Sequence, residues 1–91
     1  MKLKQDIAIG QNLARLRTQF NYTQERIATE MQLYGCSTTR NTYAQMEGGT
    51  YNIRISELLV LKEIYGCTME EFFTGLPKPS KLENNGLIDK A

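Results

Sequence analysis

Apolar side chains recur along the chain at the spacing of an α-helix. Over the segment from about Ile7 to Phe20 they are separated by three or four residues, which places them on one face of a helix. Asn21 follows, and asparagine tolerates the left-handed conformation that closes a helix. The pattern predicts a first helix over residues 7–20, whose inner face carries Ile9, Leu13, Leu16 and Phe20.

The residues after Asn21 contain a start signal for a second helix. The Thr23 hydroxyl can cap the free N–H groups of a first turn, and Glu25 suits the positive end of the helix dipole. Gly35 is expected to end this helix after about Leu33. Its inner face is predicted to carry Ile27, Ala28 and Met31.

A third, short helix is predicted over residues 40–47, between a hydroxyl-rich loop and a pair of glycines that stops it. A rotation of about 100° per residue puts Thr39, Tyr43 and Met46 on the core side. In a DNA major groove, arginine can pair with guanine and asparagine or glutamine with adenine, while alanine allows close approach. Any surface helix has a polar side, so this helix alone leaves DNA recognition open. The side opposite the core carries Arg40, Asn41, Ala44 and Gln45.

Two more helices are predicted in the second half of the chain, and no strand is expected. Ser56 is the expected cap of the fourth helix, which runs to Tyr65 with Leu58 and Leu61 on its inner face. The fifth helix, over residues 69–73, is short and begins with a capping box formed by Thr68 and Glu71. Residues 1–76 are therefore interpreted as one domain, and residues 77–91 as a polar, flexible tail.

Composition argues against catalysis and metal binding but does not decide whether the protein binds nucleic acid. The net charge of +1 neither requires nor excludes nucleic acid, and the absence of histidine removes the commonest general base and neutral metal ligand. Cys36 and Cys67 lie far apart, which favours free thiols in a reducing cytoplasm over a metal or redox site. No run is apolar enough to span a membrane, and no nucleophile stands with a base. We expect no enzyme, no cofactor, no metal and no membrane association.

Five segments, in order and at nearly the same spacing, resemble the lambda-repressor/Cro type of helix-turn-helix family, also called XRE. The resemblance covers about residues 7–75 and implies an all-α, compact five-helix lambda-repressor-like DNA-binding domain, with helices two and three as the helix-turn-helix. The segments that carry it are Ile9–Arg17, Thr23–Ala28, Tyr43–Gly49, Ser56–Leu59 and Tyr65–Phe73.

The resemblance also implies a function. A member of this family is expected to be a sequence-specific transcriptional regulator, here a repressor that binds double-stranded DNA at a near-palindromic operator as a homodimer. The alternative is a helix-turn-helix accessory protein that acts mainly through protein partners, such as an antitoxin or a mobile-element immunity or conjugation factor. In that case the outer face of the third helix would be free to carry any residue.

Site residues follow from the resemblance position by position. The base-reading positions correspond to the outer face of the third helix, Arg40, Asn41, Ala44 and Gln45. Gln24 corresponds to a residue that contacts a phosphate or helps to position the third helix. Positions expected to contact the DNA backbone are Gln24, Thr39, Thr42, Asn52, Arg54 and Ser56.

Arg17 and Glu47 correspond to an ion pair that joins the first and third helices in many relatives. Both lie at the flank of their apolar faces, which supports a structural role for the pair. The chain departs from the family pattern in a longer connection between Ala28 and Tyr43, which leaves the tilt of the third helix open. It also lacks the basic residues usual after Gly49, which implies fewer phosphate contacts and more dependence on a dimer.

The expected dimer interface lies at the fifth helix. Phe72 and Phe73 are adjacent, so one short helix cannot bury both equally well, and Leu76 extends the same apolar edge. Alternatively, both phenylalanines pack inside and the protein dimerises only on DNA. Three apolar residues of the tail could add to the interface: Leu82, Leu87 and Ile88.

Overall fold

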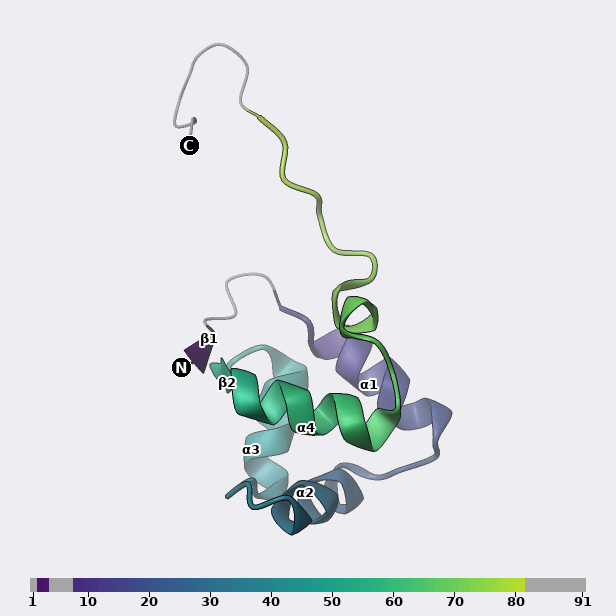
Figure 1. Ribbon diagram of the computed structural model, residues 1–91, viewed down its shortest axis with the longest axis vertical. Coiled ribbons are helices and arrows are strands. Elements are labelled where there is room, and N and C mark those ends of the chain that lie inside the picture. The colour runs from purple at the N-terminus through teal and green to yellow at the C-terminus, as the bar shows by residue number, and fades with distance from the viewer. Residues whose placement is uncertain (1, 4–7, 82–91) are drawn as a thin grey trace.

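Four α-helices follow one another in the computed structural model, which describes residues 2–3 and 8–81 (Figure 1). A short 3-10 helix and a two-residue β ladder complete the elements of the described residues. In chain order they are β1 (Lys2–Leu3), α1 (Gly10–Gln19), α2 (Gln24–Leu33), α3 (Arg40–Gly48), β2 (Ile53–Arg54), α4 (Ile55–Tyr65) and the 3-10 helix η1 (Met69–Phe73).

Local sequence signals set most helix boundaries. The Thr23 hydroxyl accepts the Arg26 N–H at 3.0 Å, and the Thr39 hydroxyl caps α3 in the same way. Asn21 closes α1 in the left-handed conformation, with φ of 57°, as predicted. Side-chain capping and left-handed closure thus satisfy backbone groups that a helix end leaves free.

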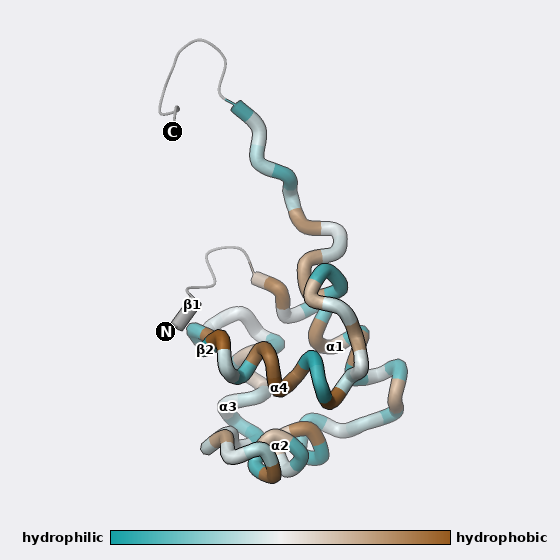
Figure 2. The backbone as a smooth tube through the Cα atoms, viewed as in Figure 1, coloured by the Kyte–Doolittle hydropathy of each residue, from teal (hydrophilic) through white to brown (hydrophobic). Residues whose placement is uncertain are grey.

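The core lies where α1 and α2 pack on α3 and where α4 covers α2 (Figure 1). The predicted inner faces of α2 and α4 are buried, and apolar residues follow much of α4 in Figure 2. Among the described residues, no helix is long and apolar enough to cross a membrane. The fully buried large side chains include Leu13, Leu16, Ile27, Met31, Tyr43, Met46, Leu61 and Phe72.

Two helix backbones approach each other closely at Gly10, at the start of α1. A Cβ atom added there would overlap the carbonyl oxygen of Glu47 and would lie 2.9 Å from the Glu47 Cα atom. Both of these atoms belong to the α3 backbone, so they cannot move aside as a flexible side chain can. Glycine therefore allows α1 and α3 to meet backbone to backbone.

A buried amide joins α1 to the C-terminal part of the fold. Asn12 is 8% exposed, and its Nδ2 donates to the carbonyl oxygens of Phe72 at 2.8 Å and Thr74 at 3.0 Å. Arg15 donates to the Glu71 carbonyl oxygen at 3.2 Å. These bonds satisfy carbonyl groups at the end of η1, which is too short to do so internally.

The prediction that the chain has no strand was wrong. Lys2–Leu3 pairs antiparallel with Ile53–Arg54, in the register Lys2 to Arg54 and Leu3 to Ile53. Ile53 is buried and Arg54 exposed, which is the alternation of a strand, but two residues give no periodic signal. The described residues are nevertheless mostly helical, as expected.

Three predicted helix starts or faces also need correction. The fourth helix begins at Ile55 with Arg54 as its N-cap, so Ser56 lies within the first turn instead of capping it. Thr38, not Thr39, is the buried threonine before α3, because Thr39 turns outward to cap the helix. Phe20 is 45% exposed, because it follows the last turn of α1. Its ring stacks on Tyr22 and Tyr65.

The fifth helix forms at the predicted place but as a 3-10 helix. Its Thr68 side chain makes no capping bond, and the Glu71 N–H donates to the Thr68 carbonyl instead. Phe72 is fully buried and Phe73 is 47% exposed, so the two adjacent phenylalanines are divided between core and surface. Residues 77–81 form no helix or strand, and Leu82, Leu87 and Ile88 lie outside the described residues.

Candidate nucleic-acid interface

The outer face of α3 carries the four residues that are predicted to read bases. Arg40, Asn41 and Gln45 are exposed and Ala44 is partly buried, whereas Tyr43 and Met46 on the opposite side are fully buried. Within the described part of the chain, the side chains of Arg40, Asn41 and Gln45 form no hydrogen bond or ion pair. Their donors and acceptors are therefore available to a ligand.

Glu47 holds the far end of α3 against two other helices. The ion pair predicted between Arg17 and Glu47 is present, with Arg17 Nε 2.7 Å from Glu47 Oε2 and a second hydrogen bond of 3.2 Å to Oε1. Gln24, the first residue of α2, donates from Nε2 to Glu47 Oε1 at 2.9 Å. One carboxylate thus joins α1, α2 and α3.

The environment of Glu47 favours its charged form. Burial alone would raise the pKa of this carboxyl, but hydrogen bonds from Arg17, Gln24 and Tyr43 outweigh it and hold the pKa below its ordinary value. Hydrogen bonding to Glu47 likewise raises the pKa of Arg17 despite partial burial. Both side chains are more than four-fifths buried, so the pair is shielded from solvent screening.

Two buried tyrosines extend this polar cluster into the core. The hydroxyl groups of Tyr43 on α3 and Tyr65 on α4 lie 2.7 Å apart. Burial raises the pKa of both phenols, so both stay protonated and can hydrogen-bond without a charge. The pair fixes α3 against α4 from the side opposite its outer face.

Gln24, one of the predicted backbone contacts, is bonded to another side chain of the protein. Its amide is engaged with Glu47 and only partly exposed, which favours the second of its two predicted roles, the positioning of α3. Thr39 and Thr42 lie at the start of α3, where their hydroxyl groups are 3.0 Å apart. Asn52, Arg54 and Ser56 are exposed along the segment from α3 into α4.

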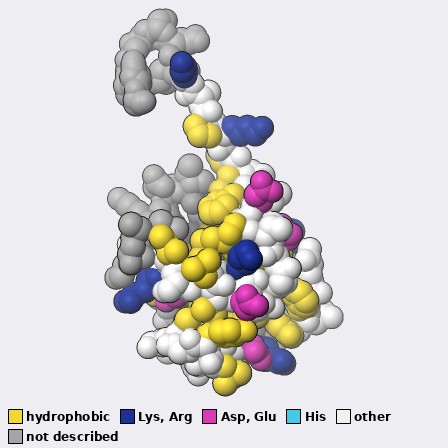
Figure 3. Space-filling model, in the orientation of Figure 1, with side chains coloured by type: hydrophobic (Ala, Val, Ile, Leu, Met, Phe, Trp, Pro, Cys, Tyr) yellow, Lys and Arg dark blue, Asp and Glu magenta, His cyan; other side chains and the backbone are white. Residues whose placement is uncertain are grey.

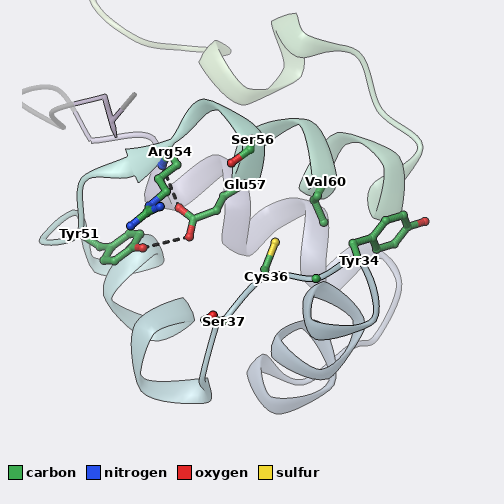
Figure 4. Close-up of a pocket in the computed structure, with 9 residues that line it drawn as sticks. Tyr34, Cys36, Ser37, Tyr51, Arg54, Ser56, Glu57 and Val60 are labelled. Atoms are coloured by element: carbon green, nitrogen blue, oxygen red, sulfur yellow. Dashed lines mark hydrogen bonds between the residues drawn. The ribbon is translucent and has the colours of Figure 1, made fainter.

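Two residues near Arg54 were not singled out from the sequence. Glu57 is only 7% exposed, and its carboxylate accepts the Arg54 backbone N–H at 2.8 Å and the Tyr51 hydroxyl at 3.0 Å (Figure 4). A glutamate three residues after an N-cap is a recognisable signal, but the predicted cap, Ser56, stands only one residue before Glu57. This carboxylate supports the start of α4 next to the predicted backbone contacts.

The longer connection between α2 and α3 is ordered by its own hydrogen bonds. The Cys36 N–H donates to the Met31 carbonyl at 3.1 Å, which closes α2 around Gly35 in the left-handed conformation. Gln32 donates from Nε2 to the Thr38 carbonyl at 2.7 Å, which ties the connection back to α2. The extra residues leave Leu33 75% and Tyr34 54% exposed.

The surface shown in Figure 3 does not carry a continuous basic stripe. Its lysine and arginine side chains are scattered, and hydrophobic side chains gather over α4 and toward η1. Cys36 and Cys67 are free thiols, and no group of residues within ranges 2–3 and 8–81 could hold a metal ion. No family model, curated protein or solved structure matches the chain.

Proposed function

We propose that the protein is a sequence-specific DNA-binding transcriptional regulator that inserts the outer face of α3 into the major groove. The observation that carries this proposal is the contrast between the two sides of α3. Its inner side is held by Glu47 and Tyr43 to three other helices, while the exposed side chains of Arg40, Asn41 and Gln45 have no hydrogen-bond partner within residues 2–3 and 8–81. A rigid helix with unpaired guanidinium and amide groups suits base-edge recognition.

Backbone contacts in this proposal come from two places. The N-terminus of α3, with Thr39 and Thr42, offers N–H and hydroxyl groups to one phosphate, and Arg54 offers a charge to another. Such contacts position the protein without reading sequence. With so few of them, a monomer would bind weakly, so the functional unit in this proposal is a homodimer on a near-palindromic operator.

A second candidate function, binding to a protein partner, has support from exposed apolar side chains. Leu33, Tyr34, Leu59 and Phe73 are each about half exposed or more, although large apolar side chains are usually buried. In that function the outer face of α3 would make no base contacts. The two candidates therefore differ in what happens when Gln45 is changed.

Selection of bound fragments from random DNA tests the proposal directly. A half-site consensus repeated with two-fold symmetry is expected from the wild-type protein. The Gln45→Ala variant should lose about 1–3 kcal/mol on that site and relax the preference at particular base pairs. Gln19→Ala, a change at an exposed glutamine at the end of α1, is the matched control and should bind as the wild type does.

The Arg54→Ala variant separates backbone contacts from base contacts. It should weaken binding to all DNA sequences alike and reduce the dependence of binding on salt. If Arg54→Ala changed the preferred bases while Gln45→Ala had no effect, α3 would not be the recognition helix. Failure of the selection to enrich any sequence would favour the protein-partner function.

A further inference from the structure

A pocket of about 330 Å³ lies between the α2–α3 connection and the start of α4. Segments that are distant in sequence converge on it: residues 34–37 from the connection, Tyr51 before β2, and residues 54–60 at the start of α4. Figure 4 shows Cys36 and Ser37 on one side and Glu57 and Val60 on the other. This volume is near the lower end for pockets that bind small molecules.

The polar groups of the pocket favour an anion. Among the described residues that line it, Glu57 alone carries a carboxylate, which already accepts the Arg54 N–H and the Tyr51 hydroxyl, one on each oxygen. The Arg54 guanidinium donates to the Tyr51 hydroxyl and forms no ion pair with any described residue, and the hydroxyls of Ser37 and Ser56 line the same space. The Glu57 carboxylate keeps its negative charge, because both of its partners are neutral groups. The hydrogen-bonding capacity that remains for a ligand therefore lies in the other N–H groups of the guanidinium and in the two serine hydroxyls.

The rest of the lining is apolar and chemically inert. Val60 and Cys36 are partly buried and pack against the core, and Tyr34 adds an aromatic ring. Burial, and then the charge of Glu57, raise the pKa of the Cys36 thiol, so it stays protonated and is no nucleophile at neutral pH. A ligand would accordingly be held by contact with these groups and not by a covalent bond.

We propose that this pocket binds a small organic carboxylate, held by the Arg54 guanidinium and the Ser37 and Ser56 hydroxyls, with its apolar body against Val60 and Cys36. A planar carboxylate suits the fork of donors that a guanidinium presents. Arg54 is also the proposed contact to the DNA backbone, so the ligand and DNA compete for one side chain. This competition rests on the proposed function, whereas ligand binding does not.

Benzoate is the probe for binding, and benzyl alcohol is its uncharged control. In chemical-shift titrations of the protein without DNA, benzoate should shift the amide signals of residues 34–37 and 54–57 with roughly millimolar affinity, as expected for so few ligand atoms. Arg54→Gln should lower that affinity at least tenfold. Arg26→Gln, at an arginine paired with Glu30 on α2, should leave it unchanged. Equal responses to benzoate and benzyl alcohol, or undiminished binding to Arg54→Gln, would overturn the proposal.

Val60→Phe fills the pocket without changing its charge and is expected to abolish benzoate binding while DNA binding persists. A melting curve establishes that this variant is folded. For competition, DNA affinity is measured in benzoate and in chloride at equal ionic strength, and benzoate should weaken it more. If benzoate does not bind but DNA does, the pocket proposal fails alone. If benzoate binds its pocket but no DNA is bound, the proposed function fails and the pocket stands.

Discussion

At the residue scale, Glu47 joins three helices through one carboxylate. Its carboxylate accepts hydrogen bonds from Arg17 on α1 and Gln24 on α2, and it lies one turn from the buried Tyr43. Since α3 has only nine residues, the position of its last turn decides the orientation of the whole helix. The outer face that we propose for DNA recognition therefore depends on an interaction at the opposite end of the helix.

Removal of the Glu47 carboxylate should destabilise the protein strongly. We expect Glu47→Ala to lower the free energy of unfolding by about 2–4 kcal/mol, because the mostly buried charge of Arg17 would lose its counter-charge and keep only the Tyr22 carbonyl as an acceptor. Urea denaturation measures this. Glu30→Ala breaks the exposed Arg26–Glu30 pair and, as the control, should cost about 0.5 kcal/mol or less. Equal melting temperatures for Glu47→Ala and the wild type would place the Arg17–Glu47 pair in solvent.

The same carboxylate should make stability depend on acid. The pKa of Glu47 in the folded protein lies below the ordinary value of 4.5. In acid, the folded protein therefore binds fewer protons at this carboxyl than the unfolded chain does. The resulting stabilisation is fully present above that ordinary value and is lost as the pH falls through the folded-state pKa. The stability difference between wild type and Glu47→Gln should thus be constant near neutrality and shrink in acid. A difference that grew in acid would contradict the lowered pKa.

At the scale of elements, the contact between α1 and α3 requires a residue without a side chain at Gly10. Gly10→Ala should destabilise by about 1–3 kcal/mol or more, because the new methyl group meets the Glu47 backbone. Gly48→Ala is the matched control on α3, where a Cβ atom would have no neighbour within 4 Å. It should be neutral or stabilise by up to about 1 kcal/mol, because alanine favours a helix. Thermal melts of both variants would reveal the opposite signs, and two equal effects would argue against the close approach.

At the scale of the whole molecule, the proposed homodimer requires an interface on the surface of the protein. The predicted interface is now divided, because Phe72 is fully buried and only Phe73 and part of Leu76 remain at the surface. In sedimentation experiments we expect the free protein to dimerise and Phe73→Glu to shift it toward monomer. Leu33→Glu, at a more exposed leucine on α2, should not do so. A wild type that stays monomeric at high concentration and binds one half-site without cooperativity would contradict the homodimer.

Much of this fold could be predicted because its signals are local. Apolar spacing placed α2, α3 and α4 to within a few residues, and Thr23, Thr39 and Asn21 marked helix ends through their own side chains. These assignments succeed because a cap or a left-handed closure depends on only a few neighbouring residues. The outer face of α3 followed from helical rotation alone, and Arg40, Asn41 and Gln45 are exposed as predicted, while Ala44 is partly buried.

The errors concern contacts between residues far apart in the chain. Nothing near Asn12 shows that its amide meets carbonyl groups more than fifty residues later, and nothing near Lys2 shows its pairing with Arg54. The division of Phe72 from Phe73 likewise depends on which side of η1 faces α1.

The amino-acid sequence by itself therefore determined the helices, the ends capped by Thr23, Thr39 and Asn21, and the polar face of α3, since each of these depends on neighbours within about one helical turn. Tertiary structure decided how Gly10 lets α1 meet α3, how Gln24 joins the Arg17–Glu47 pair, and where the α2–α3 connection encloses a pocket. The physical reason is that packing and buried hydrogen bonds are satisfied by whichever groups the folded chain brings together, whatever their separation in sequence.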